Sequence, residues 1–88
     1  MIVHNVRDRR HNWIGSWEVQ PLDMDALTEA DVGRTVIFQS YNDAEAGTLV
    51  SWRDRTLWAR FHKGDTAASC GVDDLVFAVR PLDGDPNR

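Results

Sequence analysis

A little over half of the chain, from Arg34 to Arg80, consists of short stretches in which apolar and polar residues alternate, separated by turn-forming residues. Alternation with a period of two is typical of β-strands that bury one face. Several short strands at close spacing predict a mainly β fold, and we expect a small five-stranded barrel. Since a barrel of this size fills its interior with side chains, we expect any function to be located on its outer surface.

Five strands are expected, at residues 34–40, 47–52, 56–62, 67–71 and 76–80. Between the second and third strands, residues 53–55 form an expected three-residue turn. One short helical turn is expected over residues 28–33, because Thr28 and Asp31 can cap its start and Gly33 can end it in the left-handed conformation. A second short turn, of the 3₁₀ type, is expected over residues 72–75.

The third strand defines the two faces of the expected barrel. Leu57, Ala59 and Phe61 point to one side of this strand, whereas Trp58 and Arg60 point to the other. The first set is entirely apolar and is therefore expected to face the core. The same alternation adds six further core candidates, which are Val36, Phe38, Leu49, Cys70, Phe77 and Val79.

The chain divides into three expected parts. Residues 1–30 are an N-terminal arm, loose or ordered by a partner, with one possible short strand at 13–19 that Pro21 ends. Residues 31–80 form the barrel, and residues 81–88 have the composition of a disordered tail.

The chain has 88 residues and a formal net charge of −4. Its single cysteine, Cys70, excludes an internal disulfide bond, and no cluster of cysteine and histidine has the spacing of metal ligands. We therefore expect no metal and no cofactor. The sequence has no apolar run of membrane-spanning length and no signal-peptide core, so a cytoplasmic monomer or homodimer with no membrane partner is expected.

Several motifs in the barrel segment occur in a familiar order. They are Asp-Val-Gly-Arg at 31–34, Gly-Thr-Leu-Val-Ser-Trp-Arg-Asp-Arg at 47–55, Leu-Trp-Ala-Arg-Phe at 57–61, Thr-Ala-Ala-Ser-Cys at 66–70 and Asp-Asp-Leu-Val-Phe at 73–77. In this order residues 31–80 resemble small SH3-like barrel proteins, similar to Tudor and KOW modules, that phages and prophages encode. The resemblance implies a five-stranded SH3-like barrel located in the host cytoplasm, and it supplies no catalytic residue.

The residues that could carry catalysis have simpler interpretations. None of the three histidines lies beside a serine or cysteine in a nucleophile context. Cys70 lies among small residues and is expected to belong to the core. Asp73 and Asp74 are adjacent in a helical turn, where neighbouring side chains diverge, so they are expected to cap and solubilise that turn. We therefore expect the protein not to be an enzyme.

One surface combines aromatic and basic residues, although the chain as a whole is acidic. Residues 52–63 carry four cationic residues and one aspartate, a balance of +3, whereas residues 23–45 carry six carboxylates and one arginine, a balance of −5. If residues 53–55 form the turn, Trp52 and Trp58 share one outer face. The candidate binding surface is therefore Trp52, Arg53, Arg55, Trp58, Arg60 and Lys63.

Exposed tryptophan and arginine together are typical of protein-binding hot spots. The expected function is therefore that of a non-catalytic protein-interaction module, of the phage or prophage accessory type. One alternative is a small barrel that binds single-stranded nucleic acid, although the acidic total disfavours it. A second alternative is a structural component that assembles through strand edges. The N-terminal arm is also expected, as an alternative, to cover the tryptophan face itself.

Overall fold

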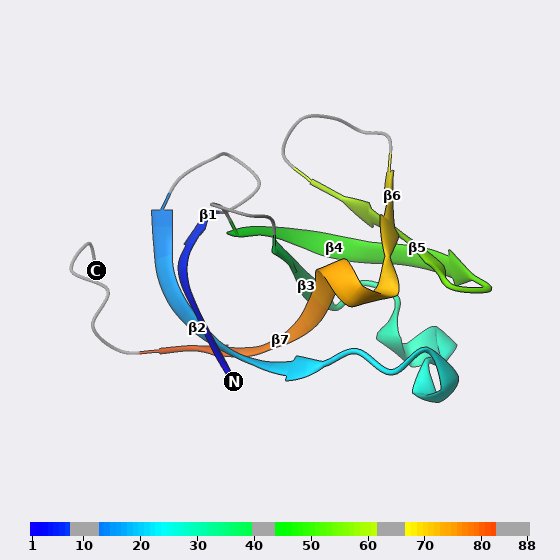
Figure 1. Cartoon of the computed structure of the whole chain (residues 1–88), viewed down its shortest axis with the longest axis horizontal. Helices are drawn as coiled ribbons and strands as arrows, with labels where there is room; N and C mark the ends of the chain where they lie inside the picture. Colours follow the sequence, from blue (N-terminus) through cyan, green and yellow to red (C-terminus); the bar gives the residue numbers. More distant parts are fainter. Residues whose placement is uncertain (8–12, 40–43, 62–66, 83–88) are drawn as a thin grey trace.

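The structure, a computed structural model, describes residues 1–7, 13–39, 44–61 and 67–82. Its strands are β1 (Ile2–Arg7), β2 (Trp13–Pro21), β3 (Thr35–Gln39), β4 (Ala44–Arg53), β5 (Thr56–Arg60), β6 (Ala68–Gly71) and β7 (Leu75–Pro81). Three 3₁₀ turns, η1 (Met24–Ala26), η2 (Glu29–Asp31) and η3 (Val72–Asp74), are the helical elements of these residues (Figure 1). The mainly β class is confirmed, but the sheet has seven strands rather than five.

The seven strands form one sheet in the order β1-β2-β7-β3-β4-β5-β6. A short parallel pairing of Val6 and Arg7 with Ala44 and Glu45 joins β1 to β4, so that β1, β2, β7, β3 and β4 form a closed ring. In Figure 1 the β1–β2 hairpin curls up at one end of the molecule, and β5 and β6 extend from β4 at the other. The predicted ring of β3 to β7 is not closed, because no pairing of described residues joins β6 to β7.

The strands β3 and β7 are buried on both faces, so the protein has two apolar cores. Neighbouring residues of β3 point to opposite sides, with Val36 in the first core and Ile37 in the second. The first core consists of Leu22, Val36, Leu49, Leu57, Ala59, Cys70, Leu75 and Phe77. The second core consists of Val3, Val6, Val19, Ile37, Ala44, Ala46 and Val76. Its residues come from the five strands of the ring.

The strand β4 contributes to both cores because it is ten residues long. Ala44 and Ala46 lie in the second core, whereas Leu49, at the opposite parity, lies in the first. Gly47 separates these two parts. A Cβ atom at this position would lie 2.6 Å from two ring carbons of Phe61 and 2.9 Å from the carbonyl oxygen of Arg60, so a side chain would have no room there.

The N-terminal residues differ from the predicted loose arm. Residues 2–7 form β1, in which Val3 and Val6 are buried. The spacing of three between them is produced by a bulge, where Asn5 has a φ of 58°. The predicted short strand at 13–19 is β2, which is two residues longer than expected and includes Pro21, paired with Val76.

Two residues of the predicted tail, Pro81 and Leu82, belong to the ordered fold. Pro81 is the last residue of β7, and the backbone N–H of Leu82 donates a hydrogen bond of 3.0 Å to the carbonyl of Ser16. Residues 83–88, for which disorder was predicted, lie outside the described residues.

Most of the predicted core is confirmed, with one error. The buried members are Val36, Leu49, Leu57, Ala59, Cys70 and Phe77. Phe38 and Phe61 are half-buried and pack edge to face, with ring centroids 6.1 Å apart. Val79 is 45% exposed, contrary to the prediction. The cause is a register shift, because Glu18 pairs with Arg80 and Val19 pairs with Ala78, which leaves Val79 without a partner in β2.

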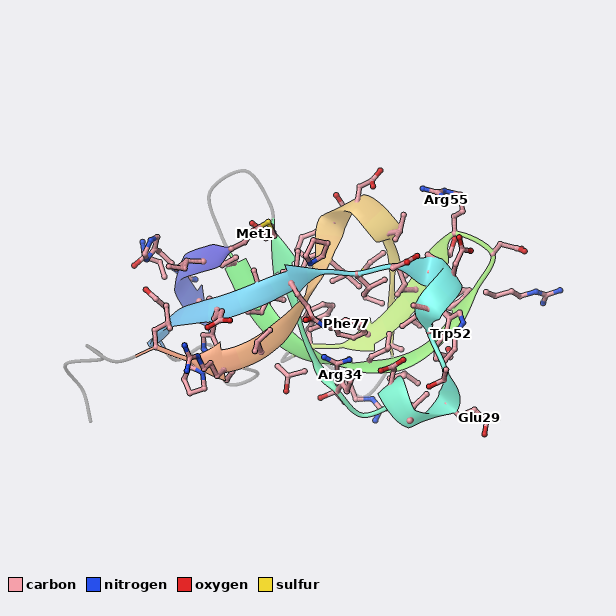
Figure 2. All side chains as sticks on the ribbon, turned by 90° about the horizontal axis from the view of Figure 1, so that it is seen from below. Met1, Glu29, Arg34, Trp52, Arg55 and Phe77 are labelled. Atoms are coloured by element: carbon pink, nitrogen blue, oxygen red, sulfur yellow. The ribbon has the colours of Figure 1, made fainter. Side chains whose placement is uncertain are left out.

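The short turn over residues 28–33 is confirmed as η2. The Asp31 carboxylate accepts a hydrogen bond of 2.9 Å from the backbone N–H of Thr28 and one of 3.0 Å from Nη1 of Arg34, and Gly33 has a φ of +94°. The Arg34 guanidinium also lies 3.8 Å from the centre of the Phe77 ring (Figure 2). Arg34 thereby links the turn to the first core, since a cation over an aromatic face is attracted by the ring.

Lowering the pH should weaken the interactions that the Asp31 carboxylate makes with Thr28 and Arg34. The hydrogen bond from the Thr28 backbone, and then that from Arg34, lower the pKa of Asp31. A carboxyl whose pKa is lower in the folded state stabilises that state above its unfolded pKa, which is about 3.9, and the stabilisation is lost as pH falls through the folded pKa. We expect wild type to have a higher melting temperature than Asp31→Asn at pH 6, and the difference to shrink below about pH 4. A difference that does not change with pH would contradict this assignment.

Candidate interaction surface

The turn between β4 and β5 determines which side chains share a face. Arg53 pairs with Thr56 and Trp52 pairs with Leu57, so the turn contains only Asp54 and Arg55. Asp54 has a φ of 56°, a left-handed conformation that aspartate tolerates better than most residues. The predicted three-residue turn over 53–55, with Trp52 opposite Thr56, is therefore wrong by one residue.

This register places the two tryptophans of the hairpin on opposite faces. Directly paired residues of antiparallel strands point to the same side, so Trp52 lies on the side of buried Leu57. Trp52 packs against the first core, as does Met24, and Figure 2 shows it beside the segment that contains η1. The predicted common face of Trp52 and Trp58 is therefore wrong. The cause is the register, together with a bulge between Leu49 and Ser51.

Trp58 lies on the other side of β5, on the outer face. We define the outer face by the cross-strand sets Ser51–Trp58–Ser69, Arg53–Thr56–Gly71 and Thr48–Arg60. Trp58 is half-buried, with a serine on each side in the neighbouring strands. Two short polar neighbours leave the tryptophan as the largest group on this face.

The outer face and its turn are basic. Residues 48–60 contain Arg53, Arg55 and Arg60 and one carboxylate, that of Asp54, so their balance is 3 − 1 = +2, whereas the whole chain carries −4. No ion pair joins these arginines to a carboxylate of the described residues. Nε of Arg60 is buried and has no hydrogen-bond partner there. Arg55 projects from the tip of the turn (Figure 2).

The structure thus brings together four of the six predicted surface residues, namely Arg53, Arg55, Trp58 and Arg60. Trp52 is separated from them by the sheet, and Lys63 lies outside the described residues. Sequence reasoning missed Ser51 and Ser69, which flank Trp58. The hairpin register that places them there follows from the turn length, which was predicted one residue too long.

Of the N-terminal residues predicted to cover the tryptophan face, Met24 packs on the first core with Trp52, whereas Trp17 does not reach that face. Trp17 packs against the second core, on the far side of β3 and β7 from the first. The β1–β2 hairpin covers the apolar face with Ile37 and Val76, whereas Leu22, Met24 and Leu27 pack on the first core. Half-buried Trp58 remains accessible in part.

The described residues contain no group of three or more histidine, cysteine or acidic side chains placed to hold a metal ion. Cys70 is buried in the first core, as predicted. Burial, and then the charge of Asp74, raise the pKa of the Cys70 thiol. A raised pKa disfavours the thiolate, which is the nucleophilic form.

Cys70 should consequently be unreactive in the folded protein. With a disulfide reagent such as Ellman's reagent at pH 8, we expect the thiol to react at least about a hundredfold more slowly than in denaturant, because reaction requires local opening. The release of the coloured thiolate measures both rates. Comparable rates would show that Cys70 is accessible and would contradict its placement in the first core.

Comparison with known proteins found no matching family model, no matching curated protein and no matching solved structure. No helix of the described residues is long and apolar enough to cross a membrane.

Proposed function

We propose that the protein is a non-catalytic protein-interaction module that binds its partner through the outer face of β4, β5 and β6. The proposal includes an SH3-like origin for residues 31–80 and a role as a phage or prophage accessory protein, which the sequence motifs favour. It also includes a cytoplasmic location, and a monomeric or homodimeric state.

The position of Trp58 is the observation that supports this proposal most. A tryptophan on the outer side of a sheet, half-buried between Ser51 and Ser69, offers a large apolar area beside polar groups. Arg53 and Arg60 lie on the same face and make no ion pair with the described carboxylates. Tryptophan and arginine are the residues that most often dominate binding energy at protein interfaces.

A single-stranded nucleic acid is the rival ligand, since arginines can contact phosphates and tryptophan can stack on bases. The acidic total of the chain opposes this reading, because nucleic-acid-binding domains are usually basic. If three arginines each neutralise one phosphate, binding of oligothymidylate should weaken with salt, with a slope of about −2 in log affinity against log salt.

The proposal can be tested with a displayed library of random peptides selected on the wild-type protein. We expect the selected peptides to bind Trp58→Ala about 30-fold more weakly than wild type, since about 2 kcal/mol is the threshold for a hot-spot residue. Calorimetric titration measures both affinities. Arg60→Gln should also weaken binding, whereas Arg80→Gln, the same change at an exposed pair with Glu18, should leave it unchanged.

Two results would count against the proposal. Selected peptides that bind wild type and Trp58→Ala equally would locate protein binding on another surface. Oligothymidylate that binds with the slope above, while no peptide is selected, would favour the nucleic-acid alternative.

A further inference from the structure

The strand β6 has an open edge directly beside the outer face. One backbone edge of β6 pairs with β5, from Thr56 with Gly71 to Ala59 with Ala68. It is the last strand in the sheet order, and no described residue pairs with its other side. Backbone N–H and C=O groups on such an edge can pair with an extended segment of another chain.

The edge is short, at four residues, but its side chains do not block strand addition. Proline, charged side chains and bulges on an edge strand hinder pairing. The residues of β6 are Ala68, Ser69, Cys70 and Gly71, of which only Cys70 turns into the first core. The other three are small and exposed, so another strand can approach their backbone.

A strand added at this edge would extend the outer face. Ser69 pairs with Trp58, so a residue placed opposite Ser69 would continue the set Ser51–Trp58–Ser69 at a spacing of about 4.8 Å. Every second side chain of the added strand would then point to the side of Trp58. That side carries Arg53 and Arg60, and the described residues of β4, β5 and β6 between 48 and 71 place no carboxylate on it.

The charges around the edge indicate which end of β6 favours acidic residues of an added strand. Asp73 and Asp74 follow Gly71 and are exposed, so they disfavour acidic residues at that end. Arg60 lies at the other end, next to Ala59, which pairs with Ala68. An acidic segment is therefore accommodated best at the Ala68 end.

From these observations we propose that the open edge of β6 accepts an extended acidic segment of a partner protein as an additional β-strand, with alternate side chains on the Trp58 side. This inference rests on the proposed protein-binding function of the outer face and specifies how the partner binds.

The experiment uses a seven-residue peptide of alternating glutamate and threonine, acetylated and amidated at its ends. Two matched peptides carry either lysine in place of glutamate or a methyl group on every backbone nitrogen. We expect the glutamate peptide to shift the amide resonances of residues 68–71 in ¹H–¹⁵N spectra, and both matched peptides to bind at least tenfold more weakly. Ser69→Glu should lower the affinity for the glutamate peptide at least tenfold, whereas Ser69→Lys, a change of similar size, should not lower it.

Three different results would contradict the inference. Resonances of residues 68–71 that do not shift with the glutamate peptide would overturn the inference. Equal binding of the methylated peptide would also overturn it, yet would leave the proposed function intact if Trp58→Ala still weakens the selected peptides. Shifts of these amides with protein concentration alone would identify a second copy of the chain as the occupant and would likewise overturn it.

Discussion

Val6→Asp is expected to destabilise the protein by at least about 4 kcal/mol, which for a domain of this size removes most of the stability. Val6 is 0% exposed, and it lies in the second core where β1 pairs with β4. A carboxylate at this position would be buried among apolar side chains, and a buried charge without a partner is among the most destabilising changes known. Chemical denaturation followed by tryptophan fluorescence measures the change.

The matched control is Ile2→Asp in the same strand. Ile2 is 55% exposed, so the same carboxylate there remains in contact with water and should change stability by less than about 1 kcal/mol. If both variants were as stable as wild type, β1 would not be part of the folded structure. The N-terminal residues would then be the loose arm that the sequence predicts.

Leu57→Ala is expected to cost about 3–5 kcal/mol, the range for a fully buried leucine that leaves a cavity. Leu57 is 0% exposed and lies in β5, between β4 and β6, where its side chain belongs to the first core. Few other atoms can move into the space, because Cys70 and Trp52 on the neighbouring strands are held in place by the sheet. The free energy of unfolding in urea measures the effect.

Leu27→Ala removes the same atoms from a different environment and is the control for Leu57→Ala. Leu27 follows η1 and packs against the first core from outside, only half-buried. We expect this variant to cost about 1 kcal/mol, because less apolar area returns to water and solvent can fill the space. If the two variants lost equal free energy of unfolding, Leu57 would not lie on the face of β5 that is buried in the first core.

The sequence predicts the strands of residues 31–80 and most of the first core because period-two alternation is a local signal. Leu57, Ala59 and Trp58 are assigned to their faces correctly by alternation alone. The small turn at 28–33 is also predictable, since Thr28, Asp31 and Gly33 are each suited to one position in it.

The second core is not predictable in this way. Val3 and Val6 lie on one face only because a bulge at Asn5 adds a residue between them, so their spacing of three does not resemble a strand. Alternation with Val36 and Phe77 would place Ile37 and Val76 outside the first core, and they are buried because β1 and β2 cover them. Burial on both faces depends on contacts between distant residues, and no local pattern contains that information.

Local sequence also places the residues of the candidate surface only in part. The positions of Trp58 and Arg60 as outer residues follow from the sequence, but those of Trp52 and Arg53 depend on whether the turn has two residues or three. A change of one residue in a hairpin register transfers a side chain to the other face. The bulge between Leu49 and Ser51 adds a second shift, and local sequence does not specify it.

The sharing of β4 between the two cores has a consequence for how the protein unfolds. Ala46 and Leu49 belong to different cores but are three residues apart on one strand, so neither core can open without disturbing the hydrogen bonds that support the other. Unfolding should therefore be a single cooperative transition, with the slowest-exchanging amides near the middle of β4. A fragment that begins at residue 31 would expose Ile37 and Val76 to water, so β1 and β2 should be required for the barrel segment to fold stably.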